Sequence, residues 1–267
     1  MNSSAMALQD LEKSVLRLPL AMRLAIDDIQ GKYRRTVLGP MWIALGQAAT
    51  IAGFTLVFSG LFNTSPPEYA LFLAAGLPVW SLVSTHLIEM PIALVHAKGY
   101  LESYEVPWLT HIWRRSFQYL LVFFHQIVTF FLVIVLLYAT GHTDLVHQEM
   151  LLAIPGLALV TFAGAGAGMF LSVFGARYRD LQHAMTILAS LLFFLTPVIW
   201  RANQLSERAW IYHLNPLYYF VTIVREPLLG QAPSMDTWII AGILSVVFFV
   251  LGFLSFSLSR GRLYHWL

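Results

Sequence analysis

The 267-residue chain is 58% hydrophobic and only 11% charged, whereas soluble domains carry about 25% charged residues. Its mean hydropathy of +0.69 indicates a membrane protein, and its net charge of +2 suggests no nucleic-acid partner. The chain contains no cysteine, which excludes disulfides and thiolate metal sites.

Residues 1–38 form a predicted cytoplasmic amphipathic region. Apolar side chains recur there at intervals of three and four residues, which predicts helices with one apolar face, and Pro19 is expected to begin the second. The two sets are Leu8, Leu11, Val15 and Leu18, then Met22, Ile26, Ile29 and Tyr33. The region could be a helical hairpin packed on a soluble surface or a helix lying in the membrane interface. Its proximity to an apolar stretch favours the interfacial interpretation.

Residues 39–267 contain six apolar stretches, at 39–62, 69–94, 116–140, 149–173, 184–200 and 236–258. About 20 helical residues cross a hydrocarbon core about 30 Å thick. The fifth stretch has only 17 residues, but apolar flanks are expected to extend it. A backbone in lipid must satisfy its own hydrogen bonds, and these stretches lack the alternation of barrel strands. The sequence therefore predicts an all-α membrane protein with six transmembrane helices.

Basic residues indicate the orientation of these helices. If the N-terminus is cytoplasmic, 13 of the 16 Lys and Arg residues fall on the inside, and only Arg201, Arg208 and Arg225 fall outside. Because cytoplasmic loops are enriched in Lys and Arg, we expect a multi-pass protein with both termini in the cytoplasm.

Segment 201–235 contains an apolar run, Leu217–Val224, that is too short to span a membrane. It is interpreted either as a loop packed on the outer surface or as a re-entrant piece that forms a gate. Pro216 and Pro227 bracket the run, and Pro227 is expected to stop a helix there. Arg225 and Glu226 are expected to reach water or to pair locally.

The motifs of several enzyme and metal-site classes are missing from the sequence. His86 and Glu89 lie three residues apart, but two ligands are too few for a closed metal site, so we predict neither a metal nor a catalytic centre. Gly31 and Lys32 are followed by Tyr33, which rules out a phosphate-binding loop for ATP. Gly164 and Gly168 predict a close approach between two helices.

Through four motifs, the sequence resembles the membrane subunit of bacterial polysaccharide-exporting ABC transporters. These are the ABC-2 type permeases that export O-antigen, capsule and teichoic acid. The four motifs lie at 32–42, 176–180, 196–198 and 215–226, in that order. The version at 176–180 is more similar to O-antigen exporters than to group 2 capsule exporters. The residues that carry the resemblance are Arg34, Arg35, Gly39, Pro40, Trp42, Arg177, Arg179, Asp180, Asn215, Pro216, Arg225 and Glu226.

The resemblance implies a homodimer in the bacterial inner membrane, paired with two copies of a nucleotide-binding ATPase subunit. The resemblance implies that ATP and Mg²⁺ bind to that partner and that this chain holds no cofactor. The resemblance also implies a coupling helix within 95–107, which could otherwise be an ordinary solvated loop, and two re-entrant gate helices within 201–235. Candidate partner-binding residues are Lys98, Tyr100, Glu102, Tyr104 and Glu105, and candidate gate residues are Trp210, Tyr218, Tyr219 and Phe220. Relatives often carry adjacent basic residues in the coupling helix, whereas Lys98 stands here with Glu102 and Glu105.

The expected function is that of a channel-forming permease subunit in an ATP-driven exporter of lipid-linked polysaccharide, O-antigen in particular. An ABC-2 permease for a drug or small lipid is the alternative with the same fold. An intramembrane enzyme is a third class, for which the sequence offers no constellation of catalytic residues.

Overall fold

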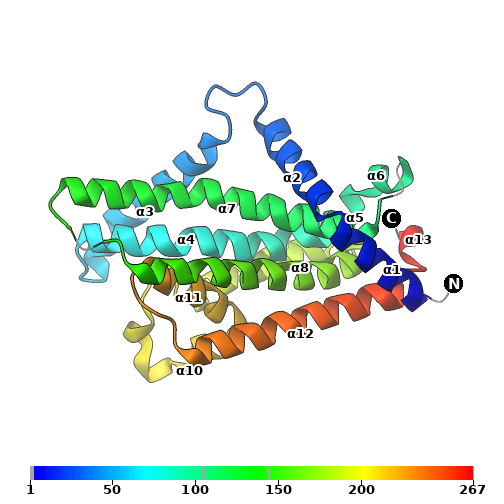
Figure 1. The fold of residues 1–267 in the computed structure, drawn as a ribbon. Helices are drawn as coiled ribbons and strands as arrows, with labels where there is room; N and C mark the ends of the chain where they lie inside the picture. Colours follow the sequence, from blue (N-terminus) through cyan, green and yellow to red (C-terminus); the bar gives the residue numbers. More distant parts are fainter. Residues whose placement is uncertain (1–2, 104–105, 144, 267) are drawn as a thin grey trace.

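The computed structural model describes residues 3–103, 106–143 and 145–266, and every regular element within those ranges is a helix. In chain order the helices are α1 (Ser3–Leu16), α2 (Leu18–Tyr33), α3 (Met41–Leu61), α4 (Pro66–Glu89), η1 (Met90–Ile92), α5 (Ala93–His96), α6 (Lys98–Ser103), α7 (Trp108–Ala139), η2 (Gln148–Leu152), α8 (Ala153–Arg177), α9 (Leu181–Leu195), η3 (Ala202–Arg208), α10 (Trp210–His213), α11 (Pro216–Leu228), α12 (Met235–Ser259) and α13 (Leu263–Trp266). The long helices form an elongated bundle with both termini at one end and α10 at the other (Figure 1). We call these the terminal end and the opposite end.

Five helices in the described ranges are long and apolar enough to cross a membrane. They are Met41–Leu61, Pro66–Leu101, Trp108–Ala139, Gln148–Arg177 and Met235–Ser259. The chain is therefore a multi-pass membrane protein, as its composition predicts.

The fifth predicted span is shorter than expected. Helix α9 has 15 residues, which correspond to about 22 Å and fall short of a hydrocarbon core about 30 Å thick. The helix extends beyond the predicted stretch on its N-terminal side, to Leu181, but it ends at Leu195 and not at residue 200. It ends there because Thr196 is extended (φ −97°, ψ 135°) and precedes Pro197. The count of six spans therefore stays a prediction.

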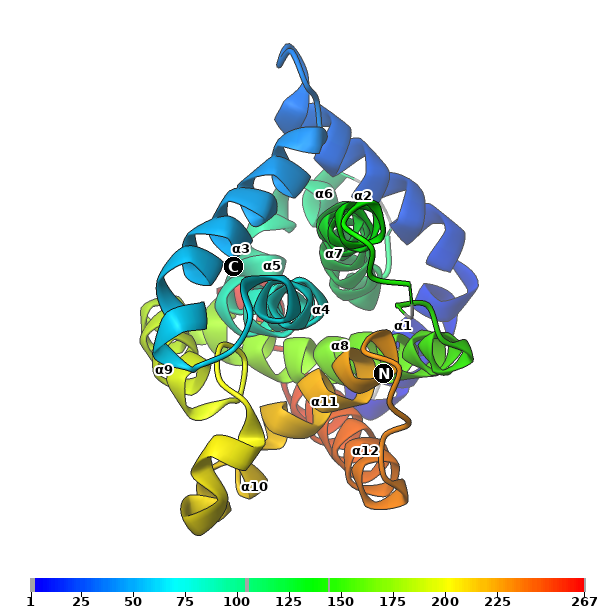
Figure 2. The ribbon, with the colours of Figure 1, turned by 90° about the vertical axis from the view of Figure 1, so that its left-hand side faces the viewer.

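Helix α4 lies at the centre of the bundle. It packs against α3, α7, α8, α9 and α11, and the view from the opposite end shows it surrounded by them (Figure 2). The predicted close approach at Gly164 and Gly168 occurs within the chain. A Cβ on Gly164 would lie 2.5 Å from the His86 ring, and one on Gly168 would lie 2.8 Å from the Met90 sulfur. These glycines therefore bring α8 against α4 and η1.

The N-terminal region forms two helices, and Pro19 stands in the first turn of α2, as predicted. The faces that pack on the bundle carry small residues such as Ala7, Ala21 and Ala25. The predicted apolar stripe is divided: Leu8 (59%), Val15 (47%) and Ile26 (38%) are exposed, whereas Ile29 is buried. Helix α2 leans away from the bundle and α3 returns to it, so the two form a V (Figure 1). The exposed part of the stripe supports the interfacial interpretation.

Helix α11 packs against α4, α8 and α12, which anchors segment 201–235 on the bundle. Asn215 caps its first turn by accepting a hydrogen bond from the Leu217 amide at 3.0 Å, and Pro216 follows the cap. Pro227 lies in the last turn, and the helix ends one residue further, at Leu228, as expected of a proline that discourages continuation.

Candidate functional site

The motif at residues 32–42 forms the apex of the V between α2 and α3. Arg35 (φ 70°) and Gly39 (φ 57°) both adopt left-handed backbone conformations, which reverse the chain between the helices. Arg34 and Arg35 are exposed, and Trp42 is 51% exposed at the start of α3. The motif thus combines a fixed turn with accessible cationic and aromatic groups.

The predicted coupling segment contains α6, which lies at the terminal end (Figure 1). Lys98 and Tyr100 are exposed on this helix, and Glu102 lies within it. Tyr104 and Glu105 lie outside the described residues. The exposed part of α6 is short, polar and aromatic, so it can serve as a docking surface for another polypeptide.

Arg114 of α7 connects the coupling segment to the N-terminal region. Its guanidinium binds Asp28 of α2 in a two-pronged ion pair, with Nε 2.8 Å from Oδ2 and Nη2 2.5 Å from Oδ1. The same guanidinium lies 4.5 Å from the centre of the Tyr100 ring. A planar, bidentate pair of this kind fixes orientation better than a point charge does. Arg114 therefore ties α2, α6 and α7 together.

Asp10 of α1 forms a second tie at the terminal end. Its side chain is 4% exposed and accepts hydrogen bonds from the Leu109 amide at 3.0 Å and from Arg260 Nε at 3.2 Å. Burial raises the pKa of the Asp10 carboxyl above its usual value, while the Leu109 amide and the Arg260 guanidinium oppose that rise. The Arg260 guanidinium also stacks over the Trp108 ring at 4.6 Å. Helices α1, α7 and α12 are thereby joined.

The motif at 176–180 lies on the surface between α8 and α9. Arg177, Arg179 and Asp180 are exposed, and the Arg177 guanidinium lies 5.4 Å from the centre of the Trp266 ring in α13. This motif therefore adds accessible charges next to the C-terminal helix.

Neutral hydrogen bonds connect α4, the chain after α9 and the start of α11 at the opposite end. The Asn215 side-chain amide donates to Thr196 Oγ1 at 2.7 Å, which joins the motifs at 196–198 and 215–226. The Tyr69 hydroxyl of α4 donates to the Ile199 carbonyl at 2.6 Å. The sequence motifs thus meet in space and fix the start of α11 against the end of α9.

Arg225 is buried in α11, with 5% of its surface exposed. Its Nη1 donates to the Pro197 carbonyl, and its guanidinium lies 4.9 Å from the centre of the Phe72 ring. The expectation that Arg225 reaches water or pairs locally is therefore wrong for this side chain. A backbone carbonyl, which the sequence pattern does not reveal, supplies the partner. Glu226 is half-buried.

The gate candidates differ in exposure. Trp210 is 64% exposed, Tyr218 and Tyr219 are half-buried, and Phe220 is 2% exposed and packs toward Phe248 of α12. Tyr212, Tyr218 and Tyr219 form a chain of ring contacts at 5.0 and 5.1 Å between α10 and α11. Only the first three candidates therefore reach the surface of the subunit, and their role at a pore stays a prediction.

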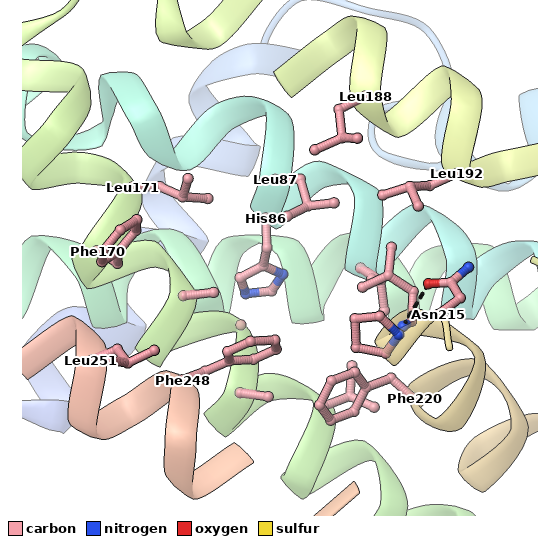
Figure 3. A pocket seen from close by; sticks show the side chains of 17 residues that line it. His86, Leu87, Phe170, Leu171, Leu188, Leu192, Asn215, Phe220, Phe248 and Leu251 are labelled. Atoms are coloured by element: carbon pink, nitrogen blue, oxygen red, sulfur yellow. Dashed lines mark hydrogen bonds between the residues drawn. The ribbon is translucent and has the colours of Figure 1, made fainter. Parts of the chain in front are cut away.

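A cavity of about 320 Å³ lies beside these elements, between α4, α8, α9, α11 and α12. Figure 3 shows His86 projecting toward its middle, with Phe170 and Leu251 toward one side and Asn215 toward the other. The cavity contains no set of metal ligands, and no three His, Cys, Asp or Glu residues gather anywhere in the described ranges.

Sequence reasoning did not find Asp10, Asp28, Arg114 or Tyr69. Each bonds to residues at least 86 positions away, so no local spacing marks it. The one available signal is the placement of Asp10 and Asp28 on amphipathic helices next to a bundle that carries basic residues at the same end.

Comparison with known proteins places these features in context. The sequence model of the ABC-2 type transporter family matches residues 24–229. The chain is 21% identical over 243 residues to the O-antigen export system permease protein RfbA of Klebsiella pneumoniae, with 88% of this chain and 90% of that protein covered. A protein of the same name from Myxococcus xanthus is 25% identical over 206 residues, covering 76% and 77% of the two chains.

The Polysialic acid transport protein KpsM of Escherichia coli is 22% identical over 210 residues, covering 77% of this chain and 80% of that protein. The family match begins within α2 and ends just after α11, so it includes the apex of the V, α6 and the Asn215–Thr196 bond.

Proposed function

The chain belongs to the ABC-2 type transporter family, and we propose that it is the channel-forming permease subunit of an exporter of lipid-linked polysaccharide, O-antigen in particular. The observation that carries the proposal is similarity along most of the chain to permeases named for O-antigen and polysialic acid. The proposed site of action is the bacterial inner membrane, with the terminal end in the cytoplasm, six spans and a re-entrant α11.

The second part of the proposal is that energy comes from a separate ATPase subunit. The chain has no phosphate-binding loop, since Lys32 follows Gly31 but precedes Tyr33. Two ATPase copies, holding ATP and Mg²⁺, pair with a homodimer of this subunit. The exposed surface of α6 around Lys98 and Tyr100 is the proposed contact. Glu102, Tyr104 and Glu105 are further candidates for this contact from the sequence.

Transport then follows from a two-state change. Closure of the ATPase pair moves α6, and the bonds of Arg114 to Asp28 and Tyr100 carry that motion to α2 and α7. A rigid, bidentate link suits this task because it transmits displacement without slipping. Two copies of the subunit enclose a path wider than one helix bundle provides.

At the opposite end, Trp210, Tyr218 and Tyr219 are the proposed contacts for the emerging polymer. Aromatic rings with a polar edge suit sugars, which offer both apolar faces and hydroxyl groups. The hydrogen bonds of Asn215 and Arg225 keep α11 seated while these rings meet the polymer.

Deletion of the gene in its own bacterium tests the proposal. We expect surface polysaccharide to disappear and lipid-linked polymer to accumulate in the cytoplasm. Reintroduction of the wild-type gene should restore the surface polysaccharide and reverse the accumulation. Unchanged surface polysaccharide together with altered export of a drug or small lipid would contradict polymer export and favour the alternative permease.

A further inference from the structure

The cavity beside α11 is open on one side of the subunit. Its rim carries three exposed apolar side chains, Phe170 of α8 (38%), Leu188 of α9 (38%) and Leu251 of α12 (49%). Helices α9 and α12 lie on different sides of α8, so the opening falls between them (Figure 2). Helices α8 and α12 are membrane-crossing helices, and the rim lies well inside their ends. The opening therefore faces the hydrocarbon region of a bilayer.

The walls of the cavity expose almost no hydrogen-bonding atom to a ligand. Asn215 uses its amide nitrogen on Thr196 and its oxygen on the Leu217 amide, the bond that is dashed in Figure 3. His86 Nδ1 donates to the Leu82 carbonyl at 2.8 Å. His86 Nε2 has no partner among the described residues, but it is buried against Gly164, where an added Cβ would lie 2.6 Å away. The remaining lining residues are apolar.

These features determine what can fill the space. An apolar cavity of about 150 Å³ stays dry and binds small hydrocarbons, and this one is about twice as large. Leaving it empty forfeits dispersion contacts along every wall. Water gains little from walls that expose almost no polar surface, whereas the neighbouring bilayer supplies hydrocarbon at the opening.

We propose that this cavity holds the hydrocarbon chain of one bilayer lipid, which enters between α9 and α12 and lies against α11. Leu217 and Phe220 of α11 form part of its wall, as does the capping residue Asn215. The bound chain thereby supports the same face of α11 that packs on α12. The existence of the site does not depend on the identity of the exported molecule.

Photo-crosslinking in nanodiscs tests this assignment. Purified protein is placed in phosphatidylcholine and phosphatidylglycerol containing a trace of phosphatidylcholine with a diazirine in one acyl chain, and labelled residues are mapped by mass spectrometry. Val83 (7% exposed) and Ala163 (2% exposed) line the cavity but lie away from the lipid-facing surface. We expect both to be labelled in the wild-type protein.

Two variants should abolish that labelling. Ala167→Phe fills the cavity from its α8 wall, and Leu251→Trp narrows the opening from an exposed position without altering the core. Gly242→Phe is the matched control, because Gly242 of α12 faces open space within the described structure. The control should keep the labelling at Val83 and Ala163, and both cavity variants should keep the labelling of exposed residues on α12.

The proposal is overturned if Val83 and Ala163 are not labelled in the wild type, or if labelling survives in Leu251→Trp. It is also overturned if a second copy of the chain covers the opening. Leu188→Cys in this cysteine-free chain would then form a crosslink between copies, and acyl-chain labelling inside the cavity would be absent.

Discussion

The two ends of the bundle are held together by different chemistry. At the terminal end, carboxylates on α1 and α2 pair with arginines, Asp10 with Arg260 and Asp28 with Arg114. At the opposite end, Asn215 bonds to Thr196, Tyr69 to the Ile199 carbonyl and Arg225 to the Pro197 carbonyl. Both ends carry ion pairs, but those at the terminal end are largely buried, whereas the pair at the opposite end, Arg201 with Glu68, is exposed. The buried bonds at the opposite end use neutral acceptors, most of them on the backbone.

The difference lies in what each set of bonds can do. The ion pairs at the terminal end are largely buried, with Asp10 4%, Arg114 12% and Asp28 22% exposed, and their fixed geometry can transmit motion between helices that move. Backbone carbonyls are fixed in place, so bonds to them hold α11 on the chain that follows α9. The terminal end is thus suited to coupling, and the opposite end to keeping α11 seated.

Replacement of Arg225 should have the largest effect. Arg225→Met removes a charged donor from a buried site and leaves the Pro197 carbonyl unpaired, at a cost of about 1.5–3 kcal/mol. The free energy of unfolding in mild detergent measures this loss. Arg201→Met is the control, because the exposed pair of Arg201 with Glu68 should contribute only about 0.2–1 kcal/mol. Equal losses in the two variants would show that burial at the opposite end confers no special stability.

Replacement of Asp10 should cause the second-largest loss of stability. Asp10→Ala removes both acceptors from the Leu109 amide and Arg260, and we expect a loss of about 1–3 kcal/mol. Asp10→Asn keeps an acceptor for the Leu109 amide, and burial already disfavours the negative charge that this substitution removes. The loss of stability in Asp10→Asn should therefore be clearly smaller than in Asp10→Ala. Thermal unfolding of both variants measures the difference. If Asn is as costly as Ala, the charge rather than the amide bond holds α1 in place.

A smaller effect is expected at Arg114. Arg114→Lys keeps the charge but loses the two-pronged geometry and the contact with Tyr100. A double-mutant cycle with Asp28→Asn should give a coupling energy of about 0.5–1 kcal/mol from unfolding measurements. Export should fall more than this stability change explains, since the link also positions α6. Export that simply follows stability would count against a coupling role.

The smallest effect on stability is expected at the acidic residues of the coupling segment. Reversal of both acidic residues, Glu102→Lys with Glu105→Lys, should leave membrane insertion and unfolding unchanged but reduce export. Surface polysaccharide and the amount of protein in the membrane are the two measurements. Full export by the double variant would make 95–107 an ordinary solvated loop.

The sequence predicts the helical class, five of the long helices and the family, because hydrophobic length and local motifs are short-range signals. It also predicts that Pro19 begins α2, since proline acts on its own helix. It misses the end of α9, where Thr196 and Pro197 stop an apolar run, and it misplaces Arg225. The partners of Arg225, Asp10 and Asp28 depend on how distant helices pack against one another. No local sequence pattern encodes that packing.

ATP-dependent movement of lipid-linked polysaccharide in proteoliposomes tests the central claim most directly. The subunit is reconstituted with its ATPase partner, and polymer on the ATPase side is followed by its sensitivity to an added glycosidase. We predict that ATP makes the polymer resistant to the enzyme, and that vesicles with the subunit or the ATPase alone show no such change. Polymer that stays sensitive in the complete complex, while a drug or small lipid is moved, would contradict the account.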